Sequence, residues 1–161
     1  LTLNEDVLGR KTVLSTRTNV NYIPQGMSAV PIYERLFQGG RGFRGFELRG
    51  VSPRGVYSNP AVTPPTGPSP DPIGGTFSFF AGAQVEQPLI STFVSGVVFV
   101  DSGTVDTRAT LGAYRASAGL GVRIYLPMLG QAPLAFDYAF PFLKQPGDQT
   151  QSFSFSVDVP F

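Results

Sequence analysis

Hydrophobic and polar residues alternate with a period of two in several segments of the chain. The clearest is the C-terminal segment, in which apolar side chains occupy every second position: Phe153, Phe155, Val157, Val159 and Phe161. Because successive side chains of a β-strand point to opposite faces, this segment has one apolar face and one small, polar face. The same alternation predicts about six strands, over residues 12–22, 76–86, 93–101, 115–126, 133–142 and 152–161.

The predicted strands are long enough to cross a membrane. Strands of roughly ten residues span a bilayer when they are tilted, whereas the chain has no run of about 20 apolar residues that could form a transmembrane helix. The stretch 24–75 does not alternate, and its second half, 52–75, holds seven of the 15 prolines. Proline is excluded from central strands and helix interiors, so this stretch is predicted to be a long extended loop or a disordered tip.

The alternation has two interpretations, a transmembrane β-barrel and a soluble β-sandwich whose apolar face is buried in a core. The polar faces consist of Gly, Ser, Ala and isolated charges rather than the dense Lys and Glu of a soluble exterior, and the apolar face continues to the last residue, Phe161. These features favour an all-β, antiparallel barrel portion. The soluble sandwich, acting as a binding module, remains the alternative.

Composition excludes several classes of function. The 161 residues include no Cys, His or Trp, and the formal net charge is +1. Thiolate and imidazole metal sites and Ser-His or Cys-His nucleophile pairs are therefore absent, and no cofactor is expected. Charged residues make up 14% of the chain, below the ~25% of soluble domains. The near-neutral charge argues against a nucleic-acid partner.

The most unusual segment is residues 39–46, GGRGFRGF, which contains a G-x-G-x-x-G match at Gly40, Gly42 and Gly45. A dinucleotide site needs a strand before the match, a helix after it and an acidic residue about 20 positions later, and here a Pro-rich stretch follows. We reject that interpretation. An RNA-binding Arg-Gly segment is also disfavoured, because there is a single copy in a near-neutral chain.

Two arginines, Arg41 and Arg44, thus lie on a long loop, and two acids, Glu86 and Asp101, lie near the ends of consecutive predicted strands. If those strands form a hairpin, a guanidinium from the loop could pair with the acids in a confined interior. Solvated acids at strand ends explain the same spacing equally well. Paired carboxylates also occur in glycosidases, but nothing else in the sequence supports catalysis, so no enzyme activity is expected.

Several of these residues resemble the BamA family of outer-membrane assembly factors. The similarity is carried by residues 33–40 (YERLFQGG), 44–54 (RGFELRGVSPR), 97–103 (VVFVDSG), 116–123 (ASAGLGVR), 136–141 (FDYAFP) and the terminal strand 151–161. These segments occur in the family's order and cover nearly the whole chain. The resemblance implies a barrel of roughly 16 strands, of which residues 1–161 match about the last six and the long loop of about 24–75.

The resemblance also implies roles for individual residues. In the family the loop enters the barrel lumen and an Arg-Gly-Phe arginine pairs with acids on the inner wall. These positions match Arg44, Gly45 and Phe46 with Glu86 and Asp101, while Arg41 competes with Arg44 because the tripeptide is doubled. The C-terminal assembly signal of outer-membrane proteins matches four residues of the last strand: Phe153, Phe155, Val157 and Phe161.

The function implied by the resemblance is insertion and folding of β-barrel proteins in the bacterial outer membrane. The implied partners are outer-membrane lipid, unfolded outer-membrane proteins and accessory assembly subunits. A polypeptide-secretion pore of the same superfamily is the alternative function within this class. The chain opens Leu1-Thr2 without a methionine, which indicates a removed targeting segment or a piece of a longer protein.

Overall fold

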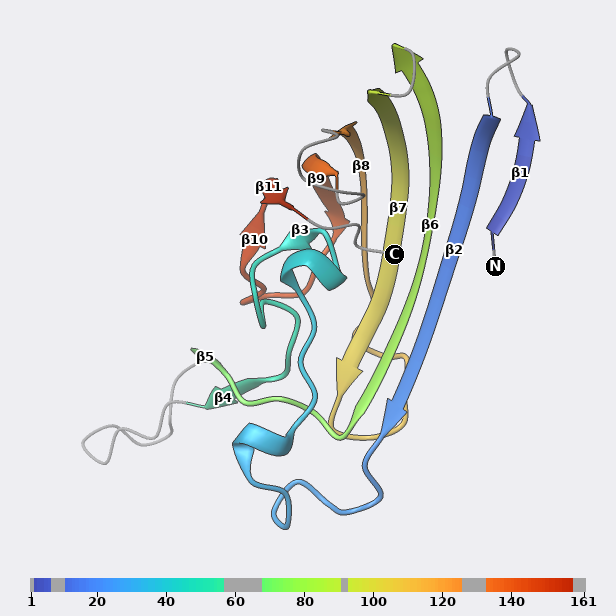
Figure 1. The fold of residues 1–161 in the computed structure, drawn as a ribbon. Helices are drawn as coiled ribbons and strands as arrows, with labels where there is room; N and C mark the ends of the chain where they lie inside the picture. The colour runs from blue at the N-terminus through green and yellow to red at the C-terminus, as the bar shows by residue number, and fades with distance from the viewer. Residues whose placement is uncertain (1, 7–10, 57–67, 91–92, 126–132, 158–161) are drawn as a thin grey trace.

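The structure, a computed structural model, describes residues 2–6, 11–56, 68–90, 93–125 and 133–157. Seven strands form one antiparallel sheet in the order β1-β2-β6-β7-β8-β9-β11, and the sheet is curved and open (Figure 1). Its strands are β1 (Thr2–Asp6), β2 (Lys11–Tyr22), β6 (Phe77–Ile90), β7 (Val94–Asp106), β8 (Arg115–Ile124), β9 (Leu134–Leu143) and β11 (Phe153–Ser156).

The six predicted strands are all present, with different ends, and β1 is an additional strand. The strand predicted over 76–86 is too short, because β6 continues to Ile90 and pairs with β7 past a register shift between Pro88 and Ile90. Proline is accommodated at such irregularities because a ladder hydrogen bond is already missing there. The last described strand is β11, and the predicted continuation to Phe161 lies partly outside the described residues.

The exposure of the two faces of the sheet is the reverse of that in a soluble protein. The polar face is buried: Gln84, Asp101, Ser117, Arg123 and Asp137 are each at most 4% exposed. The apolar face is exposed, with side chains including Val98, Val100, Leu120, Tyr138, Phe140, Phe142, Phe153 and Phe155. A soluble sandwich would bury this apolar face, so the arrangement fits a sheet whose outer face contacts lipid and disagrees with the sandwich.

The segment between β2 and β6 packs on the polar face of the sheet (Figure 1). It contains the single-turn elements η1 (Ile32–Glu34) and η2 (Gly40–Gly42) and the short strands β3 (Gly45–Phe46), β4 (Arg54–Val56) and β5 (Pro68–Pro72). The Pro-rich part is not simply extended, because β4 and β5 pair with each other. A further short strand, β10 (Thr150–Gln151), pairs with β3.

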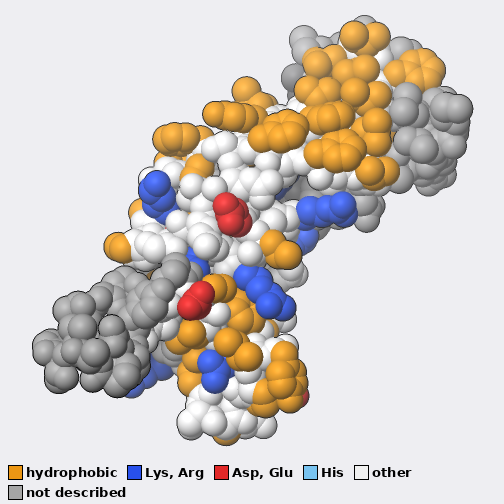
Figure 2. Space-filling model, turned by 90° about the vertical axis from the view of Figure 1, so that its left-hand side faces the viewer, with side chains coloured by type: hydrophobic (Ala, Val, Ile, Leu, Met, Phe, Trp, Pro, Cys, Tyr) orange, Lys and Arg blue, Asp and Glu red, His pale blue; other side chains and the backbone are white. Residues whose placement is uncertain are grey.

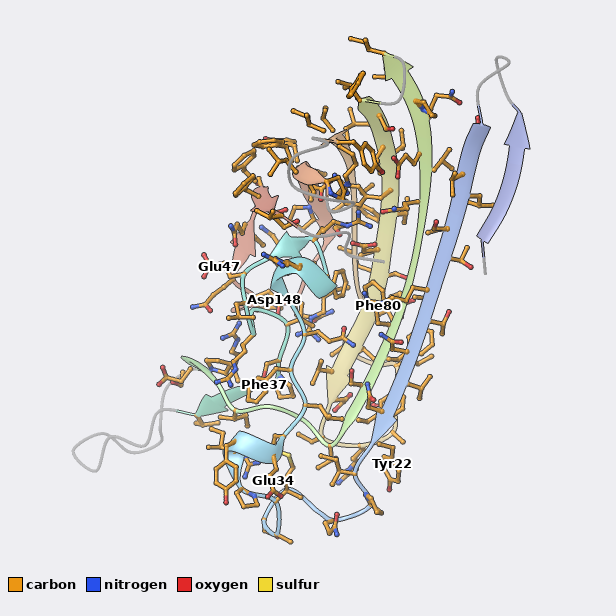
Figure 3. The ribbon with its side chains drawn as sticks, viewed as in Figure 1. Tyr22, Glu34, Phe37, Glu47, Phe80 and Asp148 are labelled. Carbon is orange, nitrogen blue, oxygen red and sulfur yellow. The ribbon has the colours of Figure 1, made fainter. Side chains whose placement is uncertain are left out.

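An aromatic and aliphatic cluster joins this segment to the sheet: Phe43, Phe46, Val51, Phe80 and Val105. The Phe43 ring meets those of Phe46 and Phe80 edge-on, with centroids 4.9 and 5.5 Å apart. Figure 3 shows Phe80 on the sheet beside the loop segment. Figure 2 shows hydrophobic side chains gathered toward the top of its visible face, with Lys and Arg side chains lying below them.

No helix within the described ranges has the length and apolar character needed to cross a membrane.

Candidate functional site

The candidate site is the buried pair formed by Arg44, in the loop just before β3, and Asp101, on β7. The Arg44 Nε and Nη2 atoms donate to the two Asp101 carboxylate oxygens at 2.8 and 2.9 Å, in a bidentate arrangement. The Arg44 backbone N–H also donates to Asp101 Oδ2 at 3.2 Å. The side chains are 2% and 1% exposed. A charge-assisted, two-bond contact of this kind fixes both distance and orientation.

Three further residues contact Arg44. Its Nη1 donates to Gln84 Oε1 on β6 at 3.1 Å, and its guanidinium carbon lies 3.5 Å from the ring centroid of Phe99 on β7. The Ser117 hydroxyl on β8 donates to the Arg44 carbonyl. Three adjacent strands therefore hold one loop residue by ionic, cation–π and hydrogen-bonding contacts.

The sheet leaves space for this pair at Gly82, which is opposite Asp101 in the β6–β7 ladder. A Cβ at position 82 would lie 2.8 Å from Asp101 Oδ1 and 2.9 Å from the Phe80 ring. Any larger residue would displace the carboxylate or the ring. Glycine on the interior face thus allows the carboxylate and the ring to lie over the strand.

The two candidate arginines are separated by their surroundings. Arg44 is buried in the pair, whereas Arg41, in η2, is exposed. Gly45 and Phe46 are both buried in β3. Phe46 belongs to the aromatic cluster. Gly45 has a positive φ of 92°, and a Cβ added at this position would lie 3.0 Å from the Ser117 Cβ. Each residue of the Arg44-Gly45-Phe46 tripeptide therefore has its own contact with the sheet.

Glu86, expected as a second acidic partner, lies elsewhere. It accepts a hydrogen bond from the Tyr125 hydroxyl at 2.7 Å. In the β6–β7 ladder Glu86 is opposite Val97, and Asp101 is opposite Gly82. The two acids are thus four residues apart along the ladder, about 13 Å, too far for one guanidinium to bind both. The second oxygen ligand of Arg44 is the amide of Gln84 instead.

Two further buried ion pairs were not anticipated from the sequence. Arg123 on β8 binds Asp137 on β9 with Nη1–Oδ1 and Nη2–Oδ2 distances of 2.7 and 3.1 Å. Arg115, at the start of β8, binds Asp148 through two contacts of 2.9 Å. The sequence did show isolated charged residues on strand faces made otherwise of small and polar side chains, and these were the signal that could have indicated buried ion pairs. Their partners could not be assigned without the strand register.

The described part of the C-terminal signal lies on β11 and just after it. Phe153, Phe155 and Val157 are 55, 51 and 44% exposed, on the outer face. Phe155 packs beside Phe136 of β9, with ring centroids 5.0 Å apart. Phe161 lies outside the described residues. Within those residues β11 has β9 as its strand neighbour and no strand on its other edge.

The cluster holds groups that bind and orient, and no nucleophile is paired with a base. Of the described residues, no group of three or more acidic side chains is placed to hold a metal ion. What the geometry does is anchor a loop to the inner wall of a sheet whose outer wall is apolar.

The conformation of Gly45 gives a direct test of this anchoring. The Gly45→Ala variant is expected to destabilise the protein by about 1 to 3 kcal/mol, because alanine is strained at a positive φ and its methyl group would press on Ser117. Urea unfolding of the protein in detergent micelles measures the loss. Gly26→Ala is the matched control, since nothing lies within 4 Å of a Cβ there. Equal stability of the two variants would contradict tight docking of β3.

Comparison with known proteins agrees with this geometry. The chain is similar to a solved structure of BamA from Haemophilus ducreyi lacking POTRA domains 1–3, with a TM-score of 0.72 and 28% sequence identity. The match covers 89% of this chain and 30% of that one, so this chain spans about a third of the relative's length. The resemblance to BamA noted in the sequence is thus confirmed.

The Omp85 superfamily domain matches residues 2–161. Members of this superfamily are barrels of the bacterial outer membrane that assemble or transport proteins without enzymatic chemistry. The seven-stranded antiparallel sheet, its exposed apolar face and the anchored loop therefore have a common explanation, and the chain belongs to the Omp85 superfamily.

Proposed function

We propose that this chain is the C-terminal part of a β-barrel that inserts and folds other barrel proteins into the outer membrane. The observation that carries the proposal is the edge strand β11, which has an exposed aromatic face and, within the described residues, no strand on its other edge. An unpaired edge binds another strand by adding it to the sheet. The substrates are unfolded outer-membrane proteins, and accessory subunits act on the larger barrel.

The mechanism is physical. In hydrocarbon every exposed backbone N–H and C=O group costs several kcal/mol, because no water is available to satisfy it. An edge strand in the membrane therefore favours pairing with an incoming strand. The seam between β11 and the first strand of the complete barrel opens, and β11 templates the substrate strand. The exposed side chains of Phe153, Phe155 and Val157 form an apolar face that contacts lipid on one side of this edge. Phe161 belongs to the same alternating pattern in the sequence.

The loop of about 24–75 has a supporting role in this proposal. Its first part, residues 24–56, extends from the end of β2 into the barrel lumen, and Arg44, Gly45 and Phe46 anchor it to the wall through Asp101. Glu86 lines the same lumen near the opposite end, with Tyr125. The anchored loop keeps strands β6, β7 and β8 together while the seam opens, because Arg44 has at least one contact on each of them.

The first test compares the isolated chain with the longer protein that carries it. Both are reconstituted in liposomes, and folding of an added unfolded β-barrel protein is followed by protease protection and by its shift on unheated gels. The longer protein is expected to accelerate folding, and residues 1–161 alone to stay at the level of empty liposomes. Seven strands that do not close leave two open edges, which is unfavourable in lipid.

Two results would overturn the proposal. Strong acceleration by the isolated chain would show that no further strands are needed. Transport of a soluble polypeptide across the liposome membrane, without insertion of barrel proteins, would instead assign the chain to a secretion pore of the same superfamily.

A further inference from the structure

We propose that the Arg44 loop clamps the base of the C-terminal edge strand, so that loop docking controls the order of β11. This inference rests on the proposed function for its significance, but the clamp itself is a structural coupling that can be measured without substrate. The clamp consists of the β3–β10 ladder and the Arg115–Asp148 pair.

The ladder joins the loop directly to the residues that precede β11. Within it Phe46 is opposite Thr150 and Gly45 is opposite Gln151. The ladder continues for one more contact, in which the Glu47 N–H donates to the Gln149 carbonyl at 3.0 Å. One residue, Ser152, separates β10 from β11. The Ser152 carbonyl also accepts the Ala139 N–H of β9 at 2.7 Å. Movement of β3 therefore reaches the edge strand through a single residue, which β9 holds as well.

The loop side of the ladder is firmly held. Arg44 immediately precedes β3 and is fixed by Asp101, and Phe46 within β3 is 1% exposed in the aromatic cluster. By contrast, β11 has only four residues paired with β9, from Phe153 to Ser156. A short strand with one neighbour has little stability of its own. Its position thus depends on what holds its first residue.

A second anchor acts on the same stretch from the other side. Asp148 binds Arg115 in two contacts of 2.9 Å and also accepts the backbone N–H of Gln145 at 2.7 Å. The Asp148 carboxylate is 1% exposed. Figure 3 shows Glu47 and Asp148 at the junction between β3 and β10. The residues before β11 are therefore held by β8 through Asp148 and by the loop through β3.

Hydrogen exchange of the full-length protein in micelles tests the clamp. Arg44→Ala is expected to raise the exchange rate of the β11 amides about tenfold or more, although Arg44 is not in that strand. Asp148→Asn, a milder and nearly isosteric change, is expected to raise the same rates. It provides an independent test of the clamp if Arg44→Ala fails to fold. Tyr125→Phe, which removes an inner-wall hydrogen bond at the opposite end of the sheet, is the control and is expected to leave β11 unchanged.

A disulfide across the ladder tests the route of the coupling. Glu47 and Gln149 have exposed side chains and lie opposite each other when the β3–β10 register is continued. Their Cα atoms are thus about 4.5 to 5.5 Å apart, the range a disulfide requires. Adding Glu47→Cys and Gln149→Cys to Arg44→Ala is expected to restore slow exchange in β11 when oxidised. The reduced form of the same protein is the matched control.

Three outcomes would overturn the clamp. The first is unchanged β11 exchange in both Arg44→Ala and Asp148→Asn. The second is equal acceleration by Tyr125→Phe, which would indicate general loosening of the sheet. The third is failure of the oxidised disulfide to slow exchange, which would place the coupling outside the ladder. Because no substrate is added, failure of the insertion function leaves these readouts intact.

Discussion

Replacing Arg44 by alanine is expected to lower the free energy of unfolding of the full-length protein by about 3 to 5 kcal/mol. The change removes the side chain that forms a bidentate ion pair with Asp101, whose carboxylate is 1% exposed. Removing one member of a buried pair leaves the other charge without its partner in a low-dielectric environment, and that penalty dominates the loss. The contacts of Arg44 with Gln84 and Phe99 are lost as well.

Arg41→Ala is the matched control for this variant. Arg41 is also followed by Gly and Phe, but its side chain is exposed, so its removal is expected to change stability by less than about 0.5 kcal/mol. Urea titration in micelles and the unheated-gel shift report the folded fraction of each variant. Comparable losses of stability for Arg41→Ala and Arg44→Ala would contradict the conclusion that Arg44 is the arginine that anchors the loop to the sheet.

A double variant separates the ion pair from simple packing. Asp101→Leu alone is expected to be strongly destabilising, because it leaves the Arg44 charge buried. Arg44→Met together with Asp101→Leu is expected to cost clearly less than the sum of the single changes, since apolar replacement of both partners leaves no buried charge. Additive losses would show that the two side chains do not act as a pair.

Leu120→Arg is expected to cost about 2 to 4 kcal/mol, the penalty for a cation on the lipid-facing side of a barrel strand near the middle of the bilayer. Leu120 lies midway along β8 and is 63% exposed on the apolar face. A protein in water would tolerate this change at an exposed site, because the guanidinium would be hydrated. The sign and size of the effect therefore report which medium contacts this face.

Leu111→Arg provides the control, because Leu111 is similarly exposed, at 57%, but lies between β7 and β8. It is expected to change stability by less than about 0.5 kcal/mol. The measurement is the folding free energy of each variant in lipid vesicles, from urea titration followed by circular dichroism. If Leu120→Arg proves as mild as Leu111→Arg, the outer face does not contact hydrocarbon.

The sequence predicted much of this fold because strand periodicity is a local property. Leu134, Phe136 and Tyr138 alternate with Ala135 and Asp137 along the chain, and the structure keeps each on its predicted face. The ends of strands were less predictable. The β6 strand continues past Pro88, because pairing with β7 outweighs the local tendency of proline to interrupt a strand.

The candidate site was only partly predictable. The Arg-Gly-Phe tripeptide and the acids were visible as unusual residue types in the chain, and Asp101 does lie against a loop arginine. The choice between Arg41 and Arg44 needed the path of the loop, which places Arg44 in the interior and Arg41 outside. The separation of Glu86 from Asp101, and its replacement beside Arg44 by Gln84, needed the β6–β7 register.

Taken alone, the sequence determined six of the seven strands of the large sheet, their two faces and the position of the long loop, since these follow from alternation and from the distribution of proline. The tertiary structure decided which face is exposed, which charges meet and how the loop joins the edge strand. The physical reason is that a period-two pattern is the same whether its apolar face meets a core or lipid. Ion pairs between distant residues depend on strand register, and register is set by neighbours in space rather than along the chain.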